Sequence, residues 1–335
     1  NLAARDHAHN LPYLLESVLE TVEDSGLNVR AVAATAGPGL ALCLNVGLTA
    51  GKELAQKLDV PFMAINHLEA HALAPRLEND GIRFPHIVLL VSGGHCCLLL
   101  AKAVGEYLRL GSTLDDSIGE AFDKVARMLG MPFAATTEVD GIGSSPGARL
   151  ENLARAGDPL SLPFPVPMRH KRSCDFSFSG LKTAVKYFVK NNAAGSDSVD
   201  DCDIAASFQH AAFTHLEDRL KVALRWCKQA QRADMIEELP SCVVVSGGVA
   251  ANSALRTRLT ALGESHGLPI HFPSQRLCAD NGVMIAWAAV ERLKAGFPTD
   301  SPLPSPAGPN FRARWPLGVD VSKDVFDGGK QVRFK

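Results

Sequence analysis

Segments with helical spacing of apolar residues alternate with short apolar segments of strand length, and this alternation limits the fold most strongly. Leu11–Val22 and Leu40–Leu58 have the spacing of helices, whereas Asn28–Ala36 and Val60–Ile65 are typical of strands. Strands that alternate with helices indicate a sheet covered by helices. The first part of the chain therefore predicts an α/β fold.

The remainder of the chain begins with a predicted hairpin and continues mainly as helices. Ile87–Val91 and Cys96–Ala101 are apolar segments separated by the glycine-containing turn Ser92–His95, as in a β-hairpin. Cys242–Val245 predicts one more buried strand. Helical spacing predicts the other elements, which are Ser117–Leu129, Ala148–Arg155, Ser179–Lys190, Ile204–Gln229, Asn252–Leu262 and Val283–Arg292.

Length and composition set wider limits on the class of protein. The 335 residues are enough for two α/β domains of ordinary size. Hydrophobic residues make up 46% and charged residues 21%, as in a soluble globular protein, and no apolar run reaches the ~18 to 20 residues of a membrane span. The net charge of −2 gives no overall attraction to nucleic acid, so RNA binding would require a local basic surface.

The eight cysteines include no C-x-x-C pair, and they are too sparse for a disulfide framework. This usage favours a reducing compartment. The chain opens at Asn1 with neither a signal peptide nor an arginine-rich presequence, so its start gives no address.

The phrase V-S-G-G occurs twice, at Val91–Gly94 and at Val245–Gly248, each time directly after an apolar strand. Such turns allow backbone amides to point at a ligand, although a glycine turn taken alone is more often structural. The second turn leads into a helix whose free amides favour an anion, and Asn252 could either cap that helix or bind the ligand. The chain has neither a P-loop nor a G-x-G-x-x-G motif, so a nucleotide would be bound in another way.

His67 and His71 have the spacing of metal ligands, because residues four apart on a helix project from one face. Asn66 is a suitable N-cap for that helix. Asp280 is the strongest distant candidate for a third ligand. Two imidazoles and a carboxylate suit Zn or Fe(II) and leave positions open for substrate. The alternative is two surface histidines that share a helix face, which is the commoner origin of an isolated H-x-x-x-H.

A metalloprotease also places two histidines at this spacing, in the motif H-E-x-x-H. Here Glu69 follows His67 by two positions, so it lies roughly 200° around the helix from that histidine. A glutamate on the opposite side is poorly placed to activate metal-bound water. The spacing therefore argues against a peptidase.

The segment Asp115–Lys124 carries four carboxylates at the start of a predicted helix. Favourable interaction with the helix dipole is a sufficient explanation for Asp115 and Asp116. Glu120 and Asp123 are three apart and share a face, so one of them could reach a hydroxyl group of a ligand.

Taken together, these sequence motifs resemble those of the tRNA N6-threonylcarbamoyladenosine transferase family. The resemblance covers nearly the whole chain, in the order that the family uses. It implies an α/β, two-lobed fold like that of actin, the heat-shock ATPases and the sugar kinases, which is a duplicated ribonuclease H-like fold. We expect residues 1–84 and 283–335 to form the first lobe and residues 85–282 the second. The matching segments are Ala4–His7, Gly37–Leu40, His67–His71, Leu90–His95, Gly119–Lys124, Phe176–Lys182, Ser246–Asn252 and Asp280–Met284.

The resemblance implies roles for individual residues. The family's metal ligands fall on His67, His71 and Asp280, the three residues that spacing also favours. Asp123 would bind the ribose hydroxyls of an adenylate, Asn252 would contact the nucleotide, and Gly147 is the match for a further substrate-contacting glycine. The phosphate would be held by Leu90, Val91, Ser92, Gly93 and Gly94. No catalytic acid or base is assigned, because the family's opening acidic segment has no counterpart in the chain.

The implied reaction is transfer of a threonylcarbamoyl group from threonylcarbamoyl-AMP to N6 of an adenosine in tRNA. One divalent metal ion, zinc or iron, would assist. The segments Asp175–Leu181 and Trp315–Asp320 resemble the mitochondrial branch, which implies a homodimer in the mitochondrial matrix without a membrane span. Two alternatives are a kinase or ATPase of the same fold and a non-catalytic nucleotide-binding scaffold. A kinase that holds Mg²⁺ through phosphates has no use for two imidazoles.

A tRNA substrate requires a basic surface, and two groups of residues could supply it. Arg169, Lys171 and Arg172 form a cluster. Lys182, Lys186 and Lys190 recur every four residues and would line one face of the next helix. A solvated helix face is the alternative for this lysine stripe.

Overall fold

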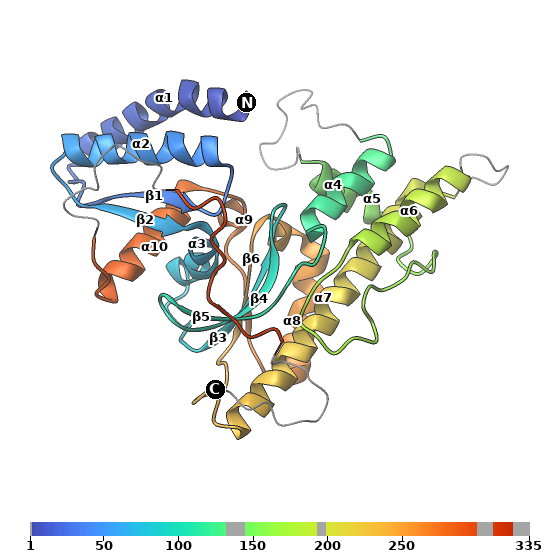
Figure 1. Ribbon diagram of the computed structural model, residues 1–335. Coiled ribbons are helices and arrows are strands. Elements are labelled where there is room, and N and C mark those ends of the chain that lie inside the picture. Colours follow the sequence, from blue (N-terminus) through green and yellow to red (C-terminus); the bar gives the residue numbers. More distant parts are fainter. Residues whose placement is uncertain (1, 132–144, 193–198, 300–310, 324–335) are drawn as a thin grey trace. The chain divides into compact units, whose positions relative to one another are not determined.

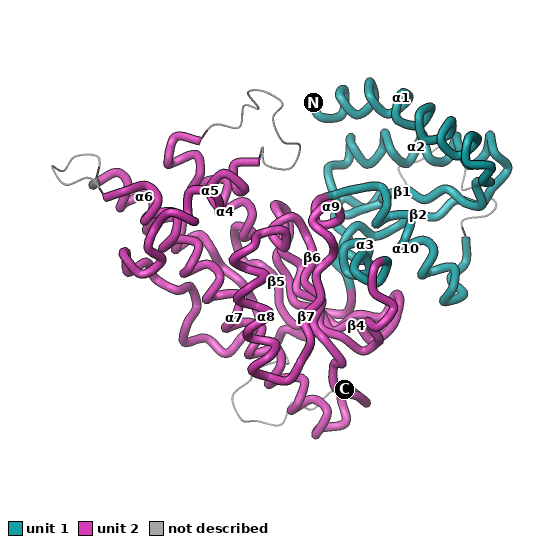
Figure 2. Tube along the Cα trace, turned by 180° about the vertical axis from the view of Figure 1, so that it is seen from behind, with its two compact units in different colours: residues 1–77, 280–317 teal, residues 78–279, 318–335 magenta. Residues whose placement is uncertain are grey.

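The computed structural model describes residues 2–131, 145–192, 199–299 and 311–323. Contacts divide the chain into two compact units, coloured separately in Figure 2. Unit 1 contains residues 1–77 and 280–317, and unit 2 contains residues 78–279 and 318–335. The predicted lobes differ from these units mainly in the tail. The strand β8 (Val319–Asp320) pairs with β5 (Glu106–Ser112), which places it in unit 2 rather than in the first lobe.

Unit 1 is built on two parallel strands, whose pairing aligns Val32 with Phe62. Its small core combines Leu48 and Ala55 of a helix with Ala36 and Phe62 of the strands. Figure 1 shows the first two helices on one side of these strands. The elements are α1 (Leu2–Asp24), β1 (Val32–Gly37), α2 (Ala41–Lys57), β2 (Phe62–Asn66), α3 (His67–Leu73), η1 (Ala74–Leu77) and α10 (Gly282–Lys294).

Unit 2 contains a mixed sheet with strand order β7-β6-β3-β4-β5-β8. Strands β3, β4 and β5 are antiparallel neighbours, whereas β6 pairs with β3 and β7 pairs with β6 in parallel. The remaining strands are β3 (His86–Val91), β4 (Cys96–Ala103), β6 (Val243–Ser246) and β7 (Ile270–His271). The helices are α4 (Ile118–Met128), α5 (Pro146–Ala154), α6 (Ser179–Asn192), α7 (Asp201–Arg232), η2 (Gly248–Ala251), α8 (Ser253–His266) and α9 (Gln275–Cys278).

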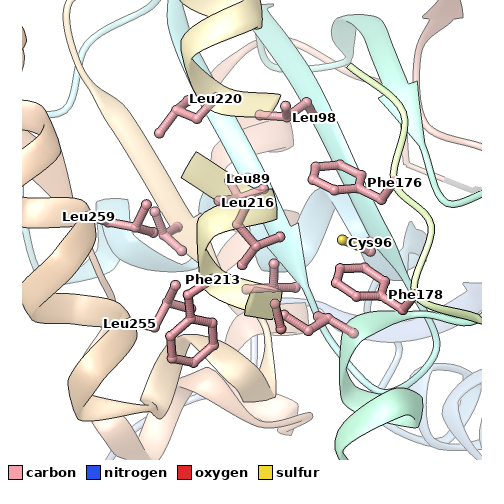
Figure 3. Close-up of a cluster of buried hydrophobic side chains, with 14 of the residues drawn as sticks. Leu89, Cys96, Leu98, Phe176, Phe178, Phe213, Leu216, Leu220, Leu255 and Leu259 are labelled. Atoms are coloured by element: carbon pink, nitrogen blue, oxygen red, sulfur yellow. The ribbon is translucent and has the colours of Figure 1, made fainter. Parts of the chain in front are cut away.

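The core of unit 2 lies between this sheet and its helices (Figure 3). Alternate residues of β3 face it, because side chains point to opposite faces of a strand with a period of two. Leu89 of β3 is aligned with Leu98 of β4 and with Val245 of β6, so the three side chains lie on the same face. Phe213 and Leu216 of α7 pack against this face. The apolar segments of the sequence are therefore strands buried by helices.

The structure confirms the predicted α/β alternation and the hairpin of β3 and β4. Strand β5 was not predicted, and neither were the two-residue strands β7 and β8. Among the described residues, no helix is long and apolar enough to cross a membrane.

Candidate functional site

The histidine pair lies at the start of α3, where β2 ends. The Asn66 side chain caps this helix, as predicted, because its Oδ1 accepts hydrogen bonds from the backbone N–H of Leu68 at 2.9 Å and of Glu69 at 3.3 Å. The cap makes His67 the first residue of the helix and His71 the residue one turn later. Their ring centroids are 4.7 Å apart.

Asp280 completes the group from a distant part of the chain. It lies just before α10, whose N-cap Asn281 accepts a hydrogen bond from Met284 N–H at 2.8 Å. One carboxylate oxygen of Asp280 lies 3.0 Å from Nε2 of His71 and 3.4 Å from Nε2 of His67. The three ligand atoms lie within 4.8 Å of one another, and all three residues belong to unit 1. The structure thus brings together the trio chosen by spacing.

The two oxygen–nitrogen distances in this trio fit a bound metal ion. Ligands held at about 2.0 to 2.1 Å from an ion are separated by roughly 3.0 Å at right angles and roughly 3.4 Å at the tetrahedral angle. The observed oxygen–nitrogen distances match these separations. Hydrogen bonds with His67 and then His71 hold the pKa of Asp280 well below its usual range, so its carboxylate is charged at neutral pH. An anionic oxygen and two imidazole nitrogens suit zinc or iron.

Glu69 is bound elsewhere, as expected from its place on the helix. Its buried carboxylate accepts a hydrogen bond from Arg292 Nη1 at 2.7 Å. A second ion pair joins Arg76 of η1 to Glu291 at 2.9 Å. Both pairs fasten α3 and η1 to α10, the helix that Asp280 precedes. Glu69 therefore supports the ligand-bearing helix and is not available as a base.

The two glycine turns meet in unit 2. Strands β3 and β6 are parallel neighbours, so both turns lie at the carboxyl ends of these strands, on the same side of the sheet. Gly247 has a φ of +100°, and a Cβ atom there would lie 2.4 Å from the carbonyl oxygen of Val91. Only glycine permits this conformation and this close approach. The repeated motif therefore marks two neighbouring turns of one sheet.

The first turn of α4 supports the first glycine turn. Ser117, the N-cap, donates a hydrogen bond to the carbonyl oxygen of Gly93 at 2.6 Å, and Gly119 N–H donates to that of Ser92 at 3.2 Å. Cβ atoms built at Gly93 and Gly94 would meet nothing within 4 Å. The hydrogen bonds from the first turn of α4 thus fix the glycine turn, and its two glycines face open space. This role of Ser117 was not predicted, although the residue is a typical N-cap ahead of an apolar helix.

Asp123 and Gly147, which the resemblance matched separately, lie together. The Gly147 N–H donates a 3.1 Å hydrogen bond to Oδ1 of Asp123, at the start of α5. Burial raises the pKa of Asp123, and this hydrogen bond opposes the increase. A partly buried carboxylate beside a glycine backbone suits recognition of a hydroxyl group. The ribose contact itself remains a prediction.

Asn252 has the environment of a structural cap. It is 5% exposed, and its Oδ1 accepts a hydrogen bond from Leu255 N–H at 3.0 Å, which caps α8. Its Nδ2 donates to Oε1 of Gln209 at 2.8 Å. The sequence left two roles open for Asn252, a helix cap and a ligand contact. The structure confirms the cap, and the nucleotide contact remains a prediction.

The sequence predicted that Asp115 and Asp116 interact mainly with the dipole of α4. In the structure their main contacts are different. They precede its N-cap and bind other segments instead. Asp115 accepts a hydrogen bond from Phe178 N–H at 2.8 Å, next to the start of α6. Asp116 forms ion pairs with Lys124 and Lys182. Lys182 is therefore neutralised locally, which sets it apart from the other lysines of the predicted stripe.

Comparison with known proteins decides the family. The family described as TsaD, tRNA N6-adenosine threonylcarbamoyltransferase, matches residues 1–287. The chain belongs to this family. A tRNA N6-adenosine threonylcarbamoyltransferase of Sphingopyxis alaskensis is 46% identical and covers 94% of the chain and 83% of the relative. A protein of the same name from Rhizobium meliloti is 44% identical, with 99% and 86% covered. The resemblance found in the sequence is thereby confirmed.

Solved structures confirm the fold of this transferase family member as similar to that of HypF proteins. HypF of T. kodakarensis matches with a TM-score of 0.56 at 16% identity over 87% of this chain. A full-length HypF in the phosphate- and nucleotide-bound form matches with a TM-score of 0.59 at 14% identity over 84% of the chain. The chain spans only 44% and 42% of these two proteins. The predicted actin-like α/β class is therefore confirmed at the level of fold.

Proposed function

We propose that this transferase moves the threonylcarbamoyl group of threonylcarbamoyl-AMP to N6 of an adenosine in tRNA. The observation that carries the proposal is the identity of 46% over 94% of the chain with a protein of that activity. The cluster of His67, His71 and Asp280 adds support, because a kinase of the same fold needs no imidazole ligands.

The described residues suggest how each part of the donor would be held. Backbone amides of Gly93 and Gly94 would bind the phosphate, since these glycines face open space, whereas the Ser92 N–H donates to the His95 carbonyl oxygen at 2.8 Å. Asp123 would accept hydrogen bonds from the ribose hydroxyls. A divalent ion held by His67, His71 and Asp280 would supply Lewis-acid polarisation of oxygen atoms of the donor.

The transfer itself requires no covalent enzyme intermediate. The adenine N6 amine attacks the carbamoyl carbon, forming a C–N bond. The bond between that carbon and the phosphate oxygen breaks, its electron pair leaves with AMP, and the amine loses a proton. Amides at the glycine turn would stabilise the charge that develops on the departing phosphate.

The decisive experiment is mass spectrometry of nucleosides from tRNA incubated with the protein, a divalent metal ion and threonylcarbamoyl-AMP. Threonylcarbamoyladenosine should form with the wild type, and it should be absent without the donor and with the His67→Ala, His71→Ala double variant. Failure of the metal-loaded wild type to form this nucleoside would reject the proposed activity.

We also infer a homodimer and a mitochondrial location. The exposed apolar side chains of α1, which include Tyr13, Leu14 and Val18, support self-association. The mitochondrial assignment is supported by the segments Asp175–Leu181 and Trp315–Asp320, which resemble that branch. Imaging of the tagged protein in its native cell would test the location, and exclusion from mitochondria would contradict it.

A further inference from the structure

Arg219 of α7 is a charged residue buried in unit 2, with only 1% of its surface exposed. Its guanidinium donates hydrogen bonds to three backbone carbonyl oxygens of one loop. The acceptors are Lys171 at 2.9 Å, Ser173 at 2.7 Å and Met168 at 3.2 Å. Arg219 therefore fastens this loop to the core of the unit.

Burial of a charged group is costly because it removes hydration. The cost is not fully offset here, since the buried Nε of Arg219 has no hydrogen-bond partner among the described residues. Burial lowers the pKa of Arg219, which shows the direction of this cost. Among the described residues, no carboxylate lies within ion-pair distance of its guanidinium. The carbonyl groups of the loop compensate the buried charge in part, and the nearby charges of Asp218 and Asp175 also favour it. Its principal structural effect is to fix the path of residues 168–173.

The outer side of the same loop is cationic. Arg169, His170, Lys171 and Arg172 are four consecutive exposed residues, which we call the cationic loop. No hydrogen bond or ion pair of these side chains is found in the described part of the chain. A turn bond from Lys171 N–H to Met168 carbonyl oxygen, at 2.9 Å, closes the loop. Three positive charges are therefore held on a fixed backbone, and none of them forms an ion pair among the described residues.

A hollow of about 750 Å³ adjoins the cationic loop. Arg169, His170 and Lys171 form part of its lining, and Phe164 with neighbouring prolines supplies apolar surface. Phosphate groups require cations, whereas unpaired bases favour aromatic and apolar surfaces. The combination is suited to an RNA strand more than to a single anion.

We propose that the cationic loop Arg169–Arg172, fixed by Arg219, binds the phosphate backbone of the tRNA substrate. The inference rests on the proposed function, which requires an RNA-binding surface on a chain whose net charge is −2. Lys182 is not included in this surface, because its charge is paired with that of Asp116.

The chain links this loop to the predicted nucleotide site within unit 2. The residues that follow the loop lead to Ser177, whose hydroxyl donates a 2.5 Å hydrogen bond to Asp115. Asp115 immediately precedes the segment that begins α4, and α4 carries Asp123. The chain thus runs from the cationic loop, which Arg219 of α7 fixes, through Ser177 to the segment that precedes α4.

The test compares two triple variants that each remove three positive charges. Arg169→Gln, Lys171→Gln, Arg172→Gln removes those of the cationic loop. The control, Lys102→Gln, Lys228→Gln, Arg232→Gln, removes exposed charges elsewhere in unit 2. The tRNA affinity of each variant is measured as a function of salt concentration. We expect the loop variant to bind more weakly and to lower the salt slope by about 0.7 to 0.9 per lost contact, while the control changes little.

An equal change in both triple variants, or an unchanged slope in the loop variant, would overturn the inference. With saturating donor, the loop variant should raise KM for tRNA and leave kcat unchanged, because its adenylate site is intact. Arg219→Met should weaken tRNA binding with an unchanged salt slope, since the surface charges remain; its fold is checked by circular dichroism. A wild type that makes no threonylcarbamoyladenosine rejects the proposed function, whereas an active wild type with a fully active loop variant rejects only this surface.

Discussion

At the scale of single residues, the two histidines of the proposed metal site differ in their surroundings. His71 is 2% exposed, whereas His67 is 17% exposed and closer to solvent. Replacing His71 by a smaller residue leaves a buried cavity, and replacing His67 does so to a lesser degree. His67 is therefore the better position at which to separate metal binding from folding.

We expect His67→Ala to lose stoichiometric metal and to remain folded, because two protein ligands are left where three were present. Elemental analysis of the purified variant gives the metal content, and circular dichroism verifies the fold. His266→Ala is the matched control, since this exposed histidine of α8 lies outside the cluster. A folded His67→Ala, His71→Ala double variant with a full complement of metal would disprove the site.

Asp123 presents a second test at this scale. Its Oδ1 is used by Gly147, so replacement by alanine would also release the start of α5. Asp123→Asn keeps an acceptor for Gly147 and removes the charge. We expect adenylate binding to weaken by about 1.5 to 3 kcal/mol, the usual value of a charged hydrogen bond, with metal content unchanged. Calorimetry that gives wild-type affinity would contradict the ribose contact.

The role of a residue could be predicted from the sequence where the local pattern allowed only one arrangement of the side chains. The spacing of His67 and His71 placed both on one helix face once Asn66 began the helix. Asn252 shows the limit, because a cap and a ligand-binding residue require the same side chain, and only the bonds to Leu255 and Gln209 distinguish them. Arg219 gave no signal, since the carbonyls that it binds are distant in sequence.

At the scale of elements, the contact between the two glycine turns gives a matched pair of substitutions. A Cβ at Gly247 would strike Val91 and would require a strained φ, whereas a Cβ at Gly248 meets nothing within 4 Å. We expect Gly247→Ala to lower the free energy of unfolding by about 1 to 3 kcal/mol. Gly248→Ala should change it by less than about 0.5 kcal/mol. Urea denaturation measures both, and equal losses would contradict the argument.

The segment that leads into α6 depends on a neutral histidine. His215 is fully buried, and its Nε2 accepts a hydrogen bond from Ser177 N–H at 3.3 Å. Burial and then the charge of Arg219 lower the pKa of His215 to about 3. The unfolded imidazole has a pKa of about 6.5, so below that pH the unfolded chain binds a proton that the folded chain does not. Stability from this group therefore falls as the pH decreases from about 6.5 to about 3.

We expect the free energy of unfolding to decrease between about pH 7 and pH 5 by roughly 2 kcal/mol more in the wild type than in His215→Asn. Denaturant titrations of both proteins at the two pH values give this difference, in which contributions of other groups cancel. Equal pH dependence of the two proteins would show that the pKa of His215 does not differ between the folded and unfolded chain.

Elements with strong internal patterns could be predicted, and those defined by their neighbours could not. The apolar runs of β3 and β6 are buried on both faces, which explains their continuous pattern. Strands β7 and β8 have two residues each and exist only through pairing with β6 and β5. Two residues carry no measurable period, so sequence gave no indication of either strand.

At the scale of the whole molecule, the two units divide the proposed chemistry. The metal ligands all belong to unit 1, and both glycine turns belong to unit 2. The tail departs from the predicted boundary because β8 adds to the edge of the larger sheet. Edge pairing depends on where a strand lies in space, which local sequence does not specify.

Self-association is the last property that belongs to this scale. Helix α1 has 23 residues, none of them buried in the isolated chain. Tyr13, Leu14 and Val18 are 64%, 62% and 59% exposed. The rest of the chain covers little of α1, so the helix exposes apolar surface that a second copy of the chain could bury.

If α1 forms the contact between two copies, Leu14→Glu, Val18→Glu should convert the dimer to a monomer, because two charges would be buried at the interface without partners. Sedimentation velocity of the wild type and the variant measures this directly. Leu160→Glu is the control, since Leu160 is 73% exposed in unit 2 and lies outside α1. The double variant should retain its metal, because the ligands lie on α3 and next to α10. A wild-type monomer, or a variant that remains dimeric, would remove α1 from the assembly.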